Sequence, residues 1–98
     1  MHYLLFYDVT ADYVERRAAY RAEHLALAKA AVARGDLVLG GALGEPVEQS
    51  VLFFSGDSPA AAEAFAKVDP YVINGVVTQW RVKPWATVVG RDAAVKVP

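Results

Sequence analysis

The pattern of apolar and polar positions predicts four strands along the chain. The segment 3–9 opens with an unbroken apolar run, and 51–54 is apolar at every position, which is typical of strands covered on both faces. The stretch 37–39 is a third, shorter apolar run. In 76–85 the side chains alternate instead, which indicates a strand at an edge with one covered face.

Two helices are predicted between these strands. From 13 to 34 the apolar positions follow a helical period, and one stripe is expected to pack on the sheet: Val14, Ala18, Leu25, Ala28 and Val32. Asp12 and Glu15 have the spacing of a capping box at the start of this helix, and Gly35 is expected to end it in a left-handed conformation. Beyond the next strand, residues 40–44 are predicted to form a flexible turn.

The second helix is expected to begin at Ser58 and Pro59, with the serine as its cap and the proline in its first turn. Asp69 should end it, because the following Pro70 disfavours helical geometry at the preceding residue. The side chains expected to face inward are those of Ala62, Phe65 and Ala66.

The order of these elements, βαββαβ, predicts a ferredoxin-like α+β fold. Its four-stranded antiparallel sheet should have the strand order 4-1-3-2, with both helices on one face. The patterns agree with this order, because the continuously apolar strands would be central and the alternating strand would lie at an edge. We expect one domain over 1–98, with its core in 1–89 and a loosely held tail at 90–98.

The open face of that sheet would still carry Tyr, Leu and Phe side chains. The chain has only 98 residues and is 55% hydrophobic, so burial against a partner would add to a small core. An exposed apolar face marks an interaction surface, and two such sheets packed together would cover it with two-fold symmetry. The sequence therefore predicts a homodimer, or a higher oligomer built from dimers.

Charge and composition narrow the class of protein further. The net charge is −1, and Arg16, Arg17 and Arg21 are interspersed with acidic residues, so a solvated helix face is favoured over a nucleic-acid or anionic membrane site. The absence of cysteine excludes disulfides, thiolate metal sites and cysteine nucleophiles. The apolar run at the start is too short to span a bilayer and lacks a basic leader. These features lead us to expect a cytoplasmic protein.

Two side chains are candidates for chemistry, although each also has a plain structural explanation. His24 lies off the expected core stripe, on a second stripe that mixes polar and aromatic side chains: Tyr13, Arg17, Tyr20, His24 and Leu27. A lone histidine in such a setting is more often structural than functional. Asp69 before a proline commonly bonds its own backbone to form a turn.

Short motifs resemble the YciI-like (YCII-related) family over about residues 1–89. The first motif is Arg21-x-x-His24-Leu25, followed by Gly35-Asp36-Leu37 and Gly41. The second runs from Asp69-Pro70-Tyr71 to Gly75 and is followed by Val82-Lys83-Pro84-Trp85. The chain departs from many relatives in having Ala42, where they have proline, after Gly41.

The resemblance implies a ferredoxin-like dimer, similar to muconolactone isomerase and other dimeric α+β barrel proteins. It also implies a pocket with a catalytic histidine and aspartate, which correspond here to His24 and Asp69. A related type of enzyme removes chloride from chlorinated hydroxyquinols with such a pair. The residues that we expect to contact a substrate are Arg21, Tyr71, Tyr20 and Gly41, although Arg21 could equally form a surface salt bridge and Tyr71 could simply pack.

Imidazole suits proton transfer because its unperturbed pKa is close to neutrality, and a neighbouring carboxylate would orient the ring. We therefore expect a cofactor-independent enzyme that isomerises a small organic molecule or eliminates a group from it. No cofactor or metal is expected, since two distant histidines without cysteine do not form a metal site, and Gly40-Gly41-x-x-Gly44 lacks the lysine of a phosphate loop. The alternatives are a non-catalytic ligand-binding module and an accessory partner of another enzyme.

Overall fold

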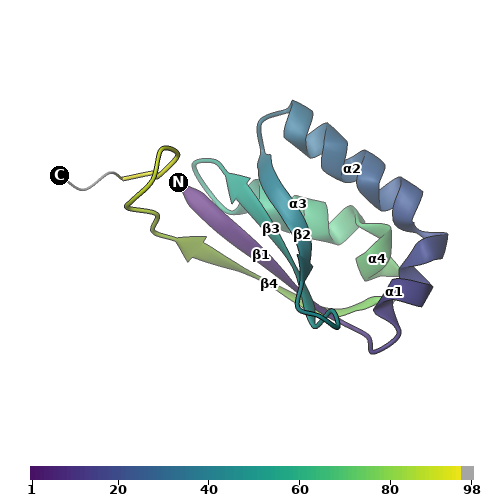
Figure 1. Ribbon diagram of the computed structural model, residues 1–98. Helices are drawn as coiled ribbons and strands as arrows, with labels where there is room; N and C mark the ends of the chain where they lie inside the picture. Colours follow the sequence, from purple (N-terminus) through teal and green to yellow (C-terminus); the bar gives the residue numbers. More distant parts are fainter. Residues whose placement is uncertain (96–98) are drawn as a thin grey trace.

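The computed structural model describes residues 1–95 (Figure 1). In chain order the elements are β1 (His2–Val9), α1 (Tyr13–Arg16), the 3-10 turn η1 (Arg17–Ala19), α2 (Arg21–Ala33), β2 (Leu37–Leu43), β3 (Gln49–Ser55), α3 (Ala60–Val68), α4 (Pro70–Ile73) and β4 (Val77–Trp85).

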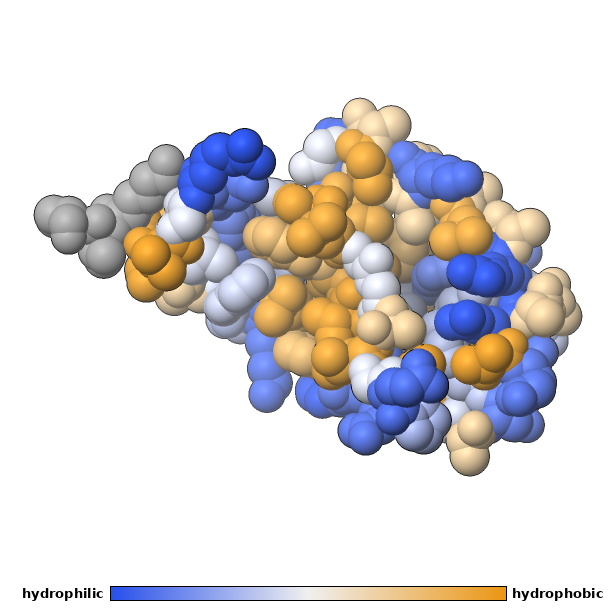
Figure 2. Space-filling model, in the orientation of Figure 1, coloured by the Kyte–Doolittle hydropathy of each residue, from blue (hydrophilic) through white to orange (hydrophobic). Residues whose placement is uncertain are grey.

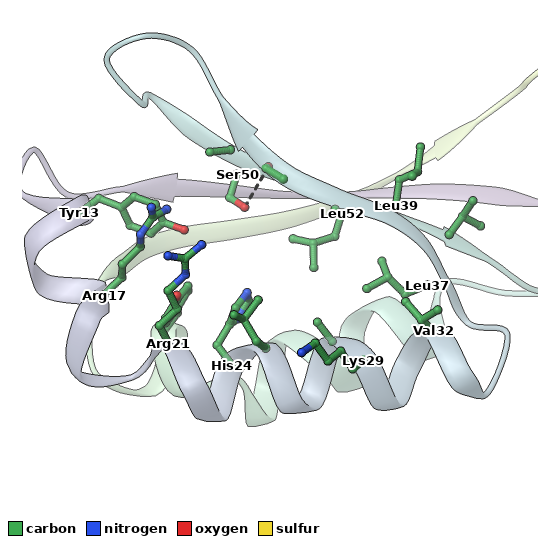
Figure 3. A pocket seen from close by; sticks show the side chains of 17 residues that line it. Tyr13, Arg17, Arg21, His24, Lys29, Val32, Leu37, Leu39, Ser50 and Leu52 are labelled. Carbon is green, nitrogen blue, oxygen red and sulfur yellow. Dashed lines mark hydrogen bonds between the residues drawn. The ribbon is translucent and has the colours of Figure 1, made fainter.

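The four strands form one antiparallel sheet in the order β2-β3-β1-β4. This is the predicted order 4-1-3-2 seen from the other edge, so the prediction of a ferredoxin-like fold is confirmed. Strands β1 and β3, which carry the continuous apolar runs, are the central pair. Helices α2 and α3 lie on the same side of the sheet (Figures 1 and 3).

The core lies between the sheet and the helices. Every second side chain of β1 and β3 points toward the helices, because successive side chains of a strand alternate between faces. The buried apolar residues that β1 and β3 contribute to this layer are Tyr3, Leu5, Tyr7, Leu52 and Phe54. Helix α3 meets them with Ala62, Phe65 and Ala66, which are all buried as predicted.

The expected single helix over 13–34 is wrong, because the chain breaks at Tyr20. Its backbone there (φ −116°, ψ −1°) separates the short α1 and η1 from α2. The sequence has no proline or glycine at this point, so apolar periodicity alone could not reveal the break. The break lets Tyr13 and His24 both turn inward from different helical segments.

The stripe that was expected to face the sheet is wrong at all its positions except Ala28, which packs against the core. Val14 and Val32 are 50% and 53% exposed, whereas Tyr13 and Ala31 are buried. The inward face follows the second stripe of mixed polar and aromatic residues. Aromatic rings make up most of this inward face. The many alanines of the segment make its faces similar in hydrophobicity, so the sequence pattern did not show which face is buried.

Local signals at element ends are correct in part. Gly35 has the predicted left-handed conformation (φ +83°), and the Ser58 hydroxyl accepts a hydrogen bond from the Ala60 N–H. The expected capping box is wrong, because the Asp12 side chain makes no cap bond. The flexible turn at 40–44 is wrong as well, since β2 continues to Leu43 and only Gly44 (φ +96°) begins the turn.

The segment after β4 folds back toward the first strand. The Val95 N–H donates to the Thr87 carbonyl, and the Ala94 N–H donates to the Thr87 hydroxyl. The same hydroxyl lies 2.6 Å from His2 Nδ1. The part of the predicted loose tail at 90–95 is therefore tied to Thr87, and 96–98 lie outside the described residues. The predicted extent of the domain stays a prediction.

Within residues 1–95, no helix combines the length and the apolar character needed to cross a bilayer.

Truncating a core residue tests this packing. Leu5→Ala, at a position with no solvent exposure, is expected to lower the free energy of unfolding by about 2–5 kcal/mol, because it removes buried apolar surface and leaves a cavity. Ile73→Ala, at a position that is 67% exposed, should change it by less than about 0.5 kcal/mol. Urea denaturation of both variants measures the two values, and equal losses would contradict the assigned core.

Candidate functional site

Asp69 lies at the junction of α3 and α4, where the following Pro70 keeps its backbone extended (φ −68°, ψ 123°). Its Oδ1 accepts a hydrogen bond from the Tyr71 N–H at 3.0 Å, which caps α4. This is the turn that an aspartate before proline commonly makes. The same carboxylate has no solvent exposure and faces the interior of the protein.

Two further side chains hydrogen-bond the buried carboxylate. The Tyr7 hydroxyl of β1 donates to Asp69 Oδ2 at 2.8 Å. His24 of α2 places Nδ1 at 3.0 Å from Oδ1 and 2.9 Å from Oδ2. A buried carboxylate is tolerated only when such donors replace its lost water. Residues from three separate elements therefore converge on one side chain.

Tyr7 is a fixed donor in this group. Burial raises the pKa of its phenol far above the ordinary range, and the neighbouring charge of Asp69 raises it further. The phenol therefore stays protonated at neutral pH, and its proton is directed to Asp69.

The ring of His24 is held in a defined orientation. It stacks on the ring of Tyr71, with 3.9 Å between centroids and 7° between planes, and the ring of Phe65 lies edge-on to it with 6.1 Å between centroids. Nδ1 is engaged by Asp69, so this nitrogen carries the donated proton. Nε2 has no hydrogen-bond partner among residues 1–95, and the side chain is 12% exposed. The free nitrogen is thus available to a bound molecule.

A cavity of about 470 Å³ lies beside His24, between α2 and the strands β2 and β3. Figure 3 shows Arg17, Arg21 and His24 pointing from the helical side toward Ser50 and Leu52 of the sheet. Such a volume is suited to a small organic molecule. The arrangement can position a ligand atom next to an oriented imidazole nitrogen.

Residues 1–95 contain no cluster of three or more histidine, aspartate or glutamate side chains that could hold a metal ion.

A family model described as the YCII-related domain matches residues 1–86. The chain belongs to this family. No curated protein matches this YCII-related protein in sequence.

Solved structures share the fold at low sequence identity. The 5-chloro-2-hydroxyhydroquinone dehydrochlorinase TftG from Burkholderia phenoliruptrix AC1100, in complex with 2,5-dihydroxybenzoquinone, is 20% identical with a TM-score of 0.72, covering 89% of this chain and 95% of that one. Protein Atu4242 from Agrobacterium tumefaciens is 16% identical (TM-score 0.60, 97% and 99% covered). Rv0793 from Mycobacterium tuberculosis is 17% identical (TM-score 0.54, 93% and 97% covered). These similarities show the fold of this YCII-related protein.

Most of the predicted site residues lie together in the YCII-related protein. His24 and Asp69 are in contact, and Arg21, Tyr71 and Gly41 line the cavity. Tyr71 is also buried, with its ring stacked on His24. It therefore both lines the cavity and packs in the core, so the two explanations offered for it each describe part of its position. Tyr20 does not line the cavity but packs against the core beside the helix break.

Sequence reasoning missed three residues of the site. Tyr7 was taken only as part of an apolar strand, although a tyrosine in a central strand needs a hydrogen-bond partner for its hydroxyl. Arg17 was assigned to a solvated charged face, although its place on the stripe of His24 was a signal for the site. It lines the cavity with its guanidinium 5.0 Å from the centre of the Tyr13 ring. Ser50 is buried and donates to the Gly41 carbonyl. Ser50 stands between the polar residue Gln49 and the apolar run 51–54, and this position gave no signal.

The raised pKa of Tyr7 predicts a loss of stability at high pH. The phenol is neutral when protonated, so its contribution is complete below about pH 10, the unfolded value. Above that pH the unfolded chain releases this proton and the folded chain does not, so the free energy of unfolding falls by up to about 1.4 kcal/mol per pH unit. Urea denaturation between pH 8 and 11 should show a shallower decline for Tyr7→Phe, and parallel curves would contradict the prediction.

Proposed function

We propose that the protein is a cofactor-independent enzyme that uses His24 and Asp69 for acid–base chemistry on a small organic substrate. The observation that carries the proposal is the hydrogen bond from Nδ1 of His24 to Asp69, which leaves Nε2 free on a side chain that lines the cavity. In this arrangement His24 exchanges protons with the substrate. Asp69 is a positioning residue that holds the ring and its tautomer.

The reaction class that we propose is isomerisation or elimination next to a carbonyl or phenol. Nε2 would remove a proton from the substrate, and the electron pair left behind would move toward the neighbouring oxygen. In an isomerisation the same ring returns the proton to another carbon atom. In an elimination the pair instead expels a leaving group. The dehydrochlorinase TftG, which acts on a chlorinated hydroquinone, has the same fold and supports this class.

The experiment combines a chemical assay with matched histidine variants. The substrates are 5-chloro-2-hydroxyhydroquinone, followed by chloride release, and a panel of small ketones in D₂O, followed by NMR for exchange of carbon-bound protons. His24→Ala should lower turnover about 10²–10⁴-fold, because a positioned acid or base contributes that much. Asp69→Asn should also lower it, since the amide no longer fixes the ring. His2→Ala is the control, because His2 contacts Thr87 and not this cavity.

Unchanged turnover in both His24→Ala and Asp69→Asn would contradict the proposal. A tightly bound molecule recovered chemically unchanged after long incubation would favour a ligand-binding module instead.

We also propose that the protein forms a homodimer through the open face of its sheet. Leu39, Leu43 and Trp85 on this face are 69%, 50% and 44% exposed, and Leu4, Val51 and Phe53 lie between them. Figure 2 shows hydrophobic residues gathered over the strands in the middle of the molecule, with hydrophilic residues around them. Burial of such a patch against a second copy removes it from water.

A charge placed in this patch tests the dimer. Phe53→Asp should shift the protein to a single chain in sedimentation velocity, because an unpaired carboxylate would be buried between the sheets. Val68→Asp, on α3 at a position that is 54% exposed, is the control and should leave the dimer intact. A wild-type protein that sediments as a single chain would contradict the proposal.

A further inference from the structure

The charges that line the cavity beside His24 all have one sign. Arg17, Arg21 and Lys29 contribute to the lining, and none of its residues is an aspartate or glutamate. The nearby carboxylate of Asp69 is fully buried behind His24. A molecule that enters the cavity therefore meets positive charge without a compensating negative side chain.

The two arginines have no carboxylate partner among residues 1–95. Arg34 and Arg81 form ion pairs with Asp36 and Asp8 at 3.0 and 3.2 Å, whereas Arg17 and Arg21 form none. Arg17 is instead held by the face of the Tyr13 ring, a contact that orients a guanidinium and leaves its N–H donors free. Arginine stays charged at any physiological pH, so these donors are always available.

Two phenol groups complete the same end of the cavity. Tyr13 and Tyr71 line it and are 4% and 2% exposed. Burial raises the pKa of the Tyr71 phenol, and the charges of Arg17 and Arg21 oppose that rise. The Tyr71 ring contacts the Tyr13 ring edge-on with 5.8 Å between centroids, and Arg17 lies over the Tyr13 ring. Neutral phenols and guanidinium groups are all donors to an anionic oxygen.

The opposite end of the cavity is apolar. Figure 3 shows Val32 and Leu37 at the end away from Arg17 and Arg21, with His24, Lys29 and Leu52 between the two ends. A ligand that fills the whole cavity thus needs an anionic group at one end and an apolar body at the other. Inorganic phosphate or acetate would occupy the cationic end alone.

We propose that the substrate is an organic anion whose carboxylate, phenolate or enolate oxygen binds Arg17 and Arg21 while its apolar ring or chain packs toward Leu37 and Leu52. This inference rests on the proposed function in taking the cavity beside His24 as the substrate site. The reacting atom then lies next to the anionic group, because His24 stands between the two ends. Arg17 is a substrate-binding residue that sets specificity for charge.

Matched small molecules test the inference without a known substrate. Benzoate carries the anion and the ring, benzamide carries the ring without the charge, and acetate carries the charge without the ring. Titrations followed by ¹⁵N–¹H NMR should give a Kd for benzoate at least about tenfold below those of benzamide and acetate. A phenolate-type anion, 2,5-dihydroxybenzoquinone, is titrated in parallel. Its tighter binding would identify a phenolate or enolate oxygen, rather than a carboxylate, as the recognised group.

Arginine variants locate the contact. Arg17→Gln and Arg21→Gln should each weaken benzoate binding about tenfold, because each removes charge-assisted hydrogen bonds. Arg91→Gln removes the same charge at a side chain that is 92% exposed and outside this cavity, so it should leave the Kd unchanged. Far-ultraviolet circular dichroism checks that the variants are folded, and Arg17→Lys and Arg21→Lys, which keep the charge, should recover part of the affinity.

Benzoate that binds no more tightly than benzamide, including the absence of binding by both, would overturn the inference. So would equal losses in Arg91→Gln and the two cavity variants.

The outcome is distinguishable from a failure of the acid–base proposal. Arginine-dependent binding of benzoate together with turnover that is insensitive to His24→Ala would leave this inference standing and end that proposal. Turnover that depends on His24 but favours neutral substrates would support the acid–base proposal and overturn this inference.

Discussion

The structure depends on how one buried carboxylate is satisfied. Asp69 has no contact with water, so its negative charge must be balanced by hydrogen bonds from the protein. The donors come from β1 (Tyr7), α2 (His24) and the backbone of α4 (Tyr71). A shift of any one of these elements would remove one of the donors that compensate the charge. The same contacts that make the buried charge tolerable therefore fix the orientation of the imidazole.

Because the first helical segment is broken, the cavity has a charged end and an apolar end. With the chain interrupted at Tyr20, α1 and η1 bring Tyr13 and Arg17 to the cavity, while α2 brings Arg21 and His24 to it. A continuous helix would repeat its faces every 3.6 residues through this region. The chain instead changes direction between the two arginines. Both then line one end of the cavity, and the apolar side chains of β2 line the other.

Because Asp69 is buried, the carboxylate that orients His24 is kept apart from the arginines that attract an anionic ligand. Its carboxylate acts on Nδ1 of His24, but the imidazole and the Tyr71 ring stand between it and the cavity. A ligand is thus exposed to Arg17 and Arg21 and not to the carboxylate that orients the base. An exposed aspartate at the same place would pair with these arginines and cancel their attraction for an anion.

The sequence alone determined the strand order, the inward face of α3, the left-handed Gly35 and the family, because these follow from period-two alternation, cap chemistry and short motifs. It also identified His24 and Asp69, through the family motifs that contain them. Tertiary structure decided what those signals could not: the break at Tyr20, the true inward face of α2, and the partnership of Tyr7 with Asp69. The physical reason is that these features arise from contacts between residues 45 or more positions apart or from a backbone turn with no proline or glycine to mark it. Local sequence patterns do not predict such contacts.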